Sequence, residues 1–142
     1  MERNIKQWQV ENVSQGGPVI PLASISQAVE VLVEISKKEM GETLDFLHVQ
    51  HGAIICTAGK GRSTLTFVPE YNRQKHSLVG SRSVRASNGN KSLLHVDGTG
   101  SVSSIPANAL LPVLDVVRAL VYIFENHDVA PFLDWTGPAV EC

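Results

Sequence analysis

The residues most able to do chemistry in this chain are two histidines three positions apart, His48 and His51. Histidine is a common zinc ligand, so the pair suggests a metal site. The pair lies, however, in a stretch that predicts a β-strand followed by a turn, and residues i and i+3 of a strand point to opposite faces of a sheet. The two rings could therefore not hold one ion, and no nearby cysteine or glutamate completes a site. We expect no bound metal and no cofactor.

Other segments resemble catalytic motifs without matching them. Gly59-Lys-Gly-Arg-Ser63 lacks the spacing of a phosphate-binding loop and joins two predicted strands instead of opening a helix. Asp97-Gly-Thr-Gly100 resembles the Asp-Thr-Gly of aspartic proteases, but a glycine interrupts it and no second copy occurs. No serine lies in a Gly-x-Ser-x-Gly elbow, and no nucleophile–base pair is recognisable. We therefore expect no catalytic residues, and a small hydrolase is the least favoured function.

Charge is distributed unevenly along the chain, although the net charge is only −2. Most of the 12 basic residues lie between positions 60 and 91, where Glu70 is the sole acid. They are Lys60, Arg62, Arg73, Lys75, Arg82, Arg85 and Lys91. Such a block is typical of solvated loops, or of a polar face that docks an oppositely charged macromolecule. The candidate partner-binding residues are Lys60, Arg62, Tyr71, Arg82, Arg85 and Asp134.

The chain has 142 residues, of which 43% are hydrophobic and 18% are charged. These values predict one globular domain over residues 1–142, with residues 1–18 as a loosely attached polar segment. The N-terminus lacks an apolar signal region, and no apolar run approaches the roughly 20 residues of a membrane helix. Cys56 lies in an apolar run and is expected to be buried, and Cys142 is terminal. Together these features predict a cytoplasmic protein in a reducing compartment.

Two helices are expected from capping residues and apolar spacing. The first begins at a capping box formed by Ser24 and Gln27, and a stripe of apolar residues with helical spacing follows. The second begins near Pro112, because proline suits the first helical position. Its apolar stripe includes Val117 and Leu120, and we expect both side chains in the main core.

Strands are expected between the two helices. They cover residues 44–50, 53–57, 64–68, 91–96 and 101–105. Their short connections require antiparallel hairpins, because parallel pairing needs a longer crossover. The expected fold class is therefore α+β, an antiparallel sheet of about five or six strands with two main helices packed on it.

The last third of the chain carries a recognisable pattern. A strand ends at Pro106, a helix has Phe124 near its end, and Pro131 and Trp135 follow. This pattern is similar to the C-terminal signature of a bacterial immunity-protein family, the first catalogued among the immunity proteins of polymorphic toxin systems. The similarity covers residues 24–136 in outline. Because some members of that family neutralise nucleic-acid deaminases, the resemblance implies an inhibitor of a nucleic-acid-modifying toxin.

The resemblance and the missing catalytic motifs together predict a protein that acts by binding. We expect an immunity protein that occludes the active site of a cognate toxin domain, and any zinc would belong to the toxin. The alternative is a nucleic-acid- or ligand-binding module that uses the basic segment 60–91, which has few aromatic residues for stacking on bases. Direct nucleic-acid binding and membrane binding are not expected. Trp135 either caps the core or anchors a partner, and the oligomeric state stays open.

Overall fold

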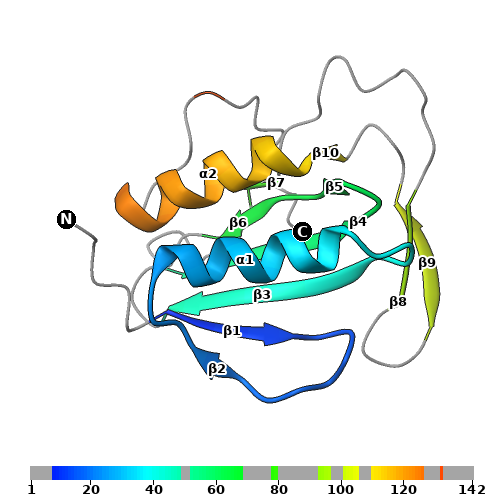
Figure 1. Ribbon diagram of the computed structural model, residues 1–142, viewed down its shortest axis with the longest axis horizontal. Coiled ribbons are helices and arrows are strands. Elements are labelled where there is room, and N and C mark those ends of the chain that lie inside the picture. The colour runs from blue at the N-terminus through cyan, green and yellow to red at the C-terminus, as the bar shows by residue number, and fades with distance from the viewer. Residues whose placement is uncertain are drawn as a thin grey trace.

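The computed structural model describes residues 8–48, 52–68, 78–79, 93–96, 101–105, 110–126 and 132. Within these residues, two helices lie over one face of a mostly antiparallel sheet, which confirms the expected α+β class (Figure 1). In chain order the elements are β1 (Gln9–Asn12), β2 (Ile20–Pro21), α1 (Ile25–Ser36), β3 (Glu42–His48), β4 (Gly52–Gly59), β5 (Arg62–Ser63), β6 (Thr66–Val68), β7 (Leu78–Val79), β8 (Leu93–Val96), β9 (Val102–Ile105), β10 (Leu111–Pro112) and α2 (Val113–Asn126).

The main sheet has the strand order β10-β5-β4-β3-β1-β2, with β6 beside β4 and β7 beside β6. All of its described pairs are antiparallel. The strand expected over residues 64–68 is shortened to β6, and the added strand β5 precedes it in the same register along β4, separated from it by residues 64–65. The division has a local cause, because the Thr57 N–H donates to the Thr64 side-chain oxygen at 2.9 Å and so interrupts the ladder.

Helix α1 begins as its capping box predicts. Ser24 is extended, and its Oγ accepts a hydrogen bond from the Gln27 N–H at 3.1 Å. This bond satisfies one of the N–H groups that a first helical turn leaves without a partner. The Gln27 side chain reaches one residue further back than expected, since its Oε1 accepts from the Ala23 N–H at 2.6 Å. The buried side chains of α1 are Ala28, Leu32, Ile35 and Ser36.

The core lies between the two helices and the central strands. On β3, buried residues alternate with half-buried ones, so one face of the strand is turned toward the helices. Phe46 of β3 meets Phe124 of α2 edge-on, with 5.8 Å between ring centroids, and Trp8 meets the same ring at 4.9 Å. Trp8 and Val10 are both buried, so the strand β1 contributes to the core as well as to the sheet.

Helix α2 differs from the expected helix at its start and in its buried face. Pro112 pairs with Arg62 in β10, and α2 begins one residue later at Val113. Leu120 is fully buried as expected, whereas Val117 is only partly buried and packs at the edge of the core. The buried side chains are Val116, Ala119, Leu120, Ile123 and Phe124. Neither described helix is long and apolar enough to cross a membrane.

Candidate protein interface

Lys60 and Arg62, the two described candidates from the sequence, lie on the hairpin that joins β4 to β5. Lys60 and Gly61 form its two-residue loop, with φ angles of 53° and 76°. Two consecutive positive φ values are those of a type I′ turn, whose twist matches that of a hairpin. The Lys60 side chain is exposed at the tip, and Arg62 is half-buried in the ladder between Gly59 and Pro112.

This turn connects the end of α1 to the start of α2. The Lys60 N–H donates to the Lys38 carbonyl at 2.8 Å, and the Gly61 N–H donates to the Ser36 carbonyl at 2.7 Å. The last carbonyls of a helix have no partner within it, so the turn supplies donors that the end of α1 needs. The Gly61 carbonyl accepts from the Val113 N–H at 3.0 Å, at the first residue of α2. The backbone that carries the Lys60 side chain is therefore held in place by both helices.

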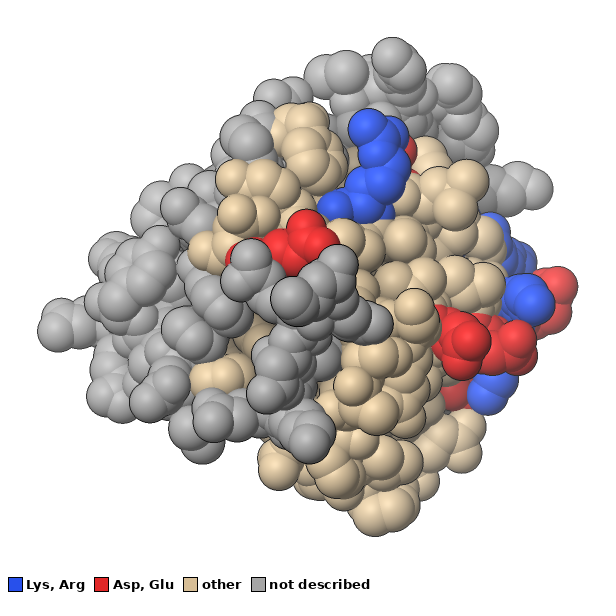
Figure 2. Space-filling model, turned by 60° about the vertical axis from the view of Figure 1, so that its left-hand side comes forward, with Lys and Arg blue, Asp and Glu red and all other residues tan. Residues whose placement is uncertain are grey.

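Three lysines lie in this turn or at the adjoining end of α1, and each is close to a carboxylate of the same chain. The pairs are Lys37–Glu34 at 3.4 Å, Lys38–Glu42 at 3.1 Å and Lys60–Glu39 at 3.9 Å. Figure 2 likewise shows basic and acidic side chains intermixed on the part of the described surface that it presents. The two exposed pairs, Lys37–Glu34 and Lys60–Glu39, contribute little to stability, but all three pairs leave the local charge balanced.

Glu42 is the buried member of this group and links it to the N-terminal strands. Its carboxylate accepts hydrogen bonds from Asn12 Nδ2 at 3.1 Å, Gln15 Nε2 at 2.7 Å and Lys38 Nζ at 3.1 Å. Burial by itself raises the pKa of Glu42, but the hydrogen bonds and the Lys38 charge outweigh burial, so the pKa is lowered overall. The carboxylate is thus ionised at neutral pH and fixes the position of Lys38.

The ribbon formed by β8 and β9 docks beside these lysines through a glycine contact. The Gly41 N–H donates to the Leu94 carbonyl at 2.7 Å, and Gly41 forms a parallel bridge with His95. A β-carbon on Gly41 would lie 3.0 Å from His95 Cβ, and one on Gly59 would lie 3.0 Å from Gly41 Cα. The absence of side chains at these two glycines therefore lets Leu93 pack against the main sheet, where it is fully buried.

The outer face of the ribbon carries exposed apolar side chains together with the exposed Ser104, which lies opposite Leu94. In the antiparallel register Val96 lies opposite Val102, and alternation along each strand places Leu94 and Val102 on the same face. Leu94 is 50% exposed and Val102 is 57% exposed, although Leu93 on the other face is completely covered. The bridge at Gly41 brings the preceding residue, Met40, close to Leu94, and Met40 is also exposed.

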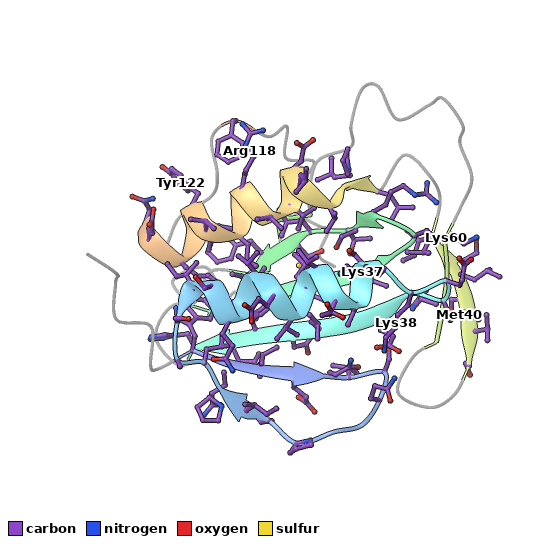
Figure 3. The ribbon with its side chains drawn as sticks, in the orientation of Figure 1. Lys37, Lys38, Met40, Lys60, Arg118 and Tyr122 are labelled. Atoms are coloured by element: carbon purple, nitrogen blue, oxygen red, sulfur yellow. The ribbon has the colours of Figure 1, made fainter. Side chains whose placement is uncertain are left out.

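We call Met40, Leu94 and Val102, together with the bordering Lys37, Lys38 and Lys60, the ribbon surface. Figure 3 shows Lys60 and Met40 beside β8 and β9, and Lys37 and Lys38 at the neighbouring end of α1. An apolar centre with a charged border is the usual composition of a protein–protein interface. Contiguous apolar side chains on the surface of a folded domain mark sites of association. The arrangement can therefore bind a protein.

The remaining candidates from the sequence, Tyr71, Arg82, Arg85 and Asp134, lie outside the described residues. Sequence reasoning missed the three apolar members of the ribbon surface. A signal was present, because Leu93 and Leu94 are consecutive in a strand and cannot both face the core.

Two of the chemically reactive side chains that the structure describes, Cys56 and His48, are buried. Cys56 is fully buried, and burial raises the pKa of its thiol to about 12, so it is not a thiolate at neutral pH. The His48 ring packs edge-on against Trp8, with 5.1 Å between centroids, and His51 is outside the described residues. Among the residues placed by the structure, no three His, Cys, Asp or Glu side chains are grouped to hold a metal ion.

Fold and surface together define an α+β domain that presents an exposed apolar ribbon face beside a charge-balanced helix end. No protein-family model matches the sequence, and no curated protein matches it either.

Proposed function

We propose that this chain is an immunity protein that binds a cognate bacterial toxin domain through the ribbon surface and occludes the toxin's active site. The observation that supports the proposal is the exposure of Leu94 and Val102 on a ribbon whose opposite face buries Leu93 completely. The similarity of the C-terminal pattern to an immunity-protein family supports the same function. Inhibition by occlusion needs a stable complex and no chemistry on this chain.

The ribbon surface would supply the centre of a larger contact. A stable interface of this kind buries about 1,200–2,000 Å² in total. Leu94 and Val102 provide rigid apolar contacts, and the flexible Met40 adapts its shape to the partner. The lysines at the border would mainly affect the rate of encounter, because peripheral charges act on association more than on dissociation.

We propose that the toxin modifies nucleic acids and is of the deaminase type. The support for this class of toxin is the resemblance of the Pro106, Phe124, Pro131 and Trp135 pattern to an immunity-protein family in which some members neutralise deaminases. The zinc ion of such a deaminase would be bound by the toxin itself.

The mixed charge of the ribbon surface favours a protein partner over nucleic acid. Binding to nucleic acid requires cationic side chains that are free to neutralise phosphates. Each lysine of the ribbon surface instead has a carboxylate of its own chain within 3.9 Å.

Co-expression with toxin domains encoded next to this gene tests the proposed function. The chain should restore growth to a bacterial host that expresses its cognate toxin, and the two proteins should co-purify at a fixed stoichiometry. Labelled DNA and RNA should show no salt-dependent binding to this chain at concentrations where the toxin binds. Failure to bind any neighbouring toxin, or tight binding of nucleic acid, would contradict the proposal.

Charge insertion tests the location of the interface. Leu94→Glu and Val102→Glu place a carboxylate in the apolar centre and should weaken toxin binding by about 100-fold or more, because burying an unpaired charge is costly. Val19→Glu is the matched control, since Val19 is similarly exposed but lies next to β2. Circular dichroism should show that all three variants fold. If Leu94→Glu and Val102→Glu bind the toxin as tightly as Val19→Glu and the wild-type protein do, the ribbon surface is not the interface.

A further inference from the structure

A second surface, on the outer side of α2, has a composition unlike that of the ribbon surface. A shallow groove with a volume of about 330 Å³ follows this side of the helix. It is lined by Val117, Arg118, Val121, Tyr122, Glu125 and Phe132. Arginine, tyrosine and phenylalanine are enriched in protein interfaces, and the first two are frequent hot spots. Leu114, one turn before Arg118, is 68% exposed and extends the apolar strip.

The groove is bounded by an exposed aromatic ring. Phe132 is 48% exposed, and the Tyr122 ring meets it edge-on with 6.0 Å between centroids. The Arg118 guanidinium lies over the same ring, with Cζ 5.6 Å from the centroid. Figure 3 shows Arg118 and Tyr122 projecting from α2 on the side away from the sheet. These contacts orient the arginine without covering it.

The charges on this side of α2 are self-complementary. Arg118 and Glu125 are seven residues apart, which is two helical turns and about 10 Å along the axis. Val121 and Tyr122 lie at the midpoint between them. If two copies of α2 pack antiparallel about that midpoint, each Arg118 lies opposite Glu125 of the second copy. The same two-fold operation brings the Val121 and Tyr122 side chains of both copies together at the centre.

We infer that the chain forms a two-fold symmetric homodimer through this side of α2. The occupant of the groove is a second copy because one arginine and one glutamate, placed symmetrically about an apolar centre, complement themselves. The ion pair that Arg118 makes within its own helix, to Asp115 at 3.7 Å, is long and exposed and competes weakly. The labelled groups of Figure 3 place this contact away from the ribbon surface, so a dimer keeps two ribbon surfaces available.

Charge reversal on the full chain tests the dimer. Analytical ultracentrifugation over a concentration series should show wild-type protein approaching twice the monomer mass of 15.4 kDa. Arg118→Glu and Glu125→Arg should each weaken dimerisation by at least about 10-fold, because each change creates two like-charge contacts. The double variant carrying both changes should dimerise like wild type, because the pairs are restored with opposite polarity. Glu30→Arg, on the exposed side of α1, is the matched control and should have no effect.

The outcomes separate this inference from the proposed function. Monomeric wild-type protein at all concentrations, or a double variant that remains monomeric, would overturn the dimer even if the toxin still binds. Loss of toxin binding in Arg118→Glu, with normal binding by Leu94→Glu, would instead assign the α2 groove to the toxin and contradict both assignments. Thermal melts of each variant monitor folding, and restoration by the double variant keeps the result interpretable if one single variant is unstable.

Discussion

Replacing Gly41 with alanine tests the packing that positions the ribbon. The added β-carbon would lie 3.0 Å from His95 Cβ, 3.1 Å from Leu93 Cδ2 and 3.2 Å from the Leu94 carbonyl oxygen. Two of these atoms, the His95 β-carbon and the Leu94 carbonyl oxygen, cannot rotate away. The ribbon must therefore move away from the sheet by a few tenths of an ångström, which disturbs the Gly41–Leu94 hydrogen bond and the buried Leu93.

Two opposing effects determine the magnitude. Alanine reduces the conformational freedom of the unfolded chain, which by itself stabilises a protein by about 0.4–1 kcal/mol. Overpacking a closely packed region costs about 1–3 kcal/mol. Gly41 does not have a positive φ, so no backbone strain adds to that cost. We therefore expect the free energy of unfolding to fall by about 1–2 kcal/mol.

Urea unfolding at equilibrium measures this change, and Gly17→Ala is the matched control. A β-carbon added to Gly17 would meet no atom within 4 Å, and Gly17 has no positive φ, so its replacement should leave stability unchanged or slightly higher. In the proposed toxin complex, Gly41→Ala should also weaken binding because the ribbon is displaced. If Gly41→Ala proves as stable as Gly17→Ala, the ribbon does not pack against this glycine.

Three further predictions concern buried or half-buried side chains. Leu120→Ala should lower the free energy of unfolding by about 2–5 kcal/mol in urea melts, because Leu120 is buried. Leu114 is exposed, so Leu114→Ala should change that free energy by less than about 0.5 kcal/mol, and equal losses in the two variants would contradict the burial of Leu120. Burial and the facing Glu11 raise the pKa of Asp45, so its ionisation costs stability as the pH rises through that raised pKa. Asp45→Asn should therefore unfold later than wild type at neutral pH and lose this advantage in acid, and a pH-independent difference would refute the cause. Cys56 should react with iodoacetamide on the order of 100-fold more slowly in the folded protein than in urea, as mass spectrometry of its peptide can show; equal rates would place the thiol outside the core.

Local signals in the sequence were sufficient for most of the elements. The start of α1 depends on Ser24 and Gln27, which are three residues apart, so the chain near them contains the whole of the capping interaction. The β8–β9 hairpin follows from two short strands with turn residues between them, and it pairs over Leu93–Val96 and Val102–Ile105. The burial of Leu120 follows from helical spacing in the same way. These predictions hold because their causes lie within a few residues.

Tertiary packing decided which faces of those elements stay exposed. Val117 and Leu120 share one apolar stripe, yet only Leu120 is completely covered, because α1 and the sheet pack against the neighbouring side of α2. Leu93 and Leu94 are identical in type, and the approach of β8 to Gly41 determines which one is buried. The Glu42 carboxylate finds Asn12 and Gln15 at separations of 30 and 27 residues. Spacing along the chain determines which side chains share one face of a helix or strand. Whether that face is buried, and which polar groups it pairs with, depends on the segment packed against it. That segment comes from a distant part of the chain.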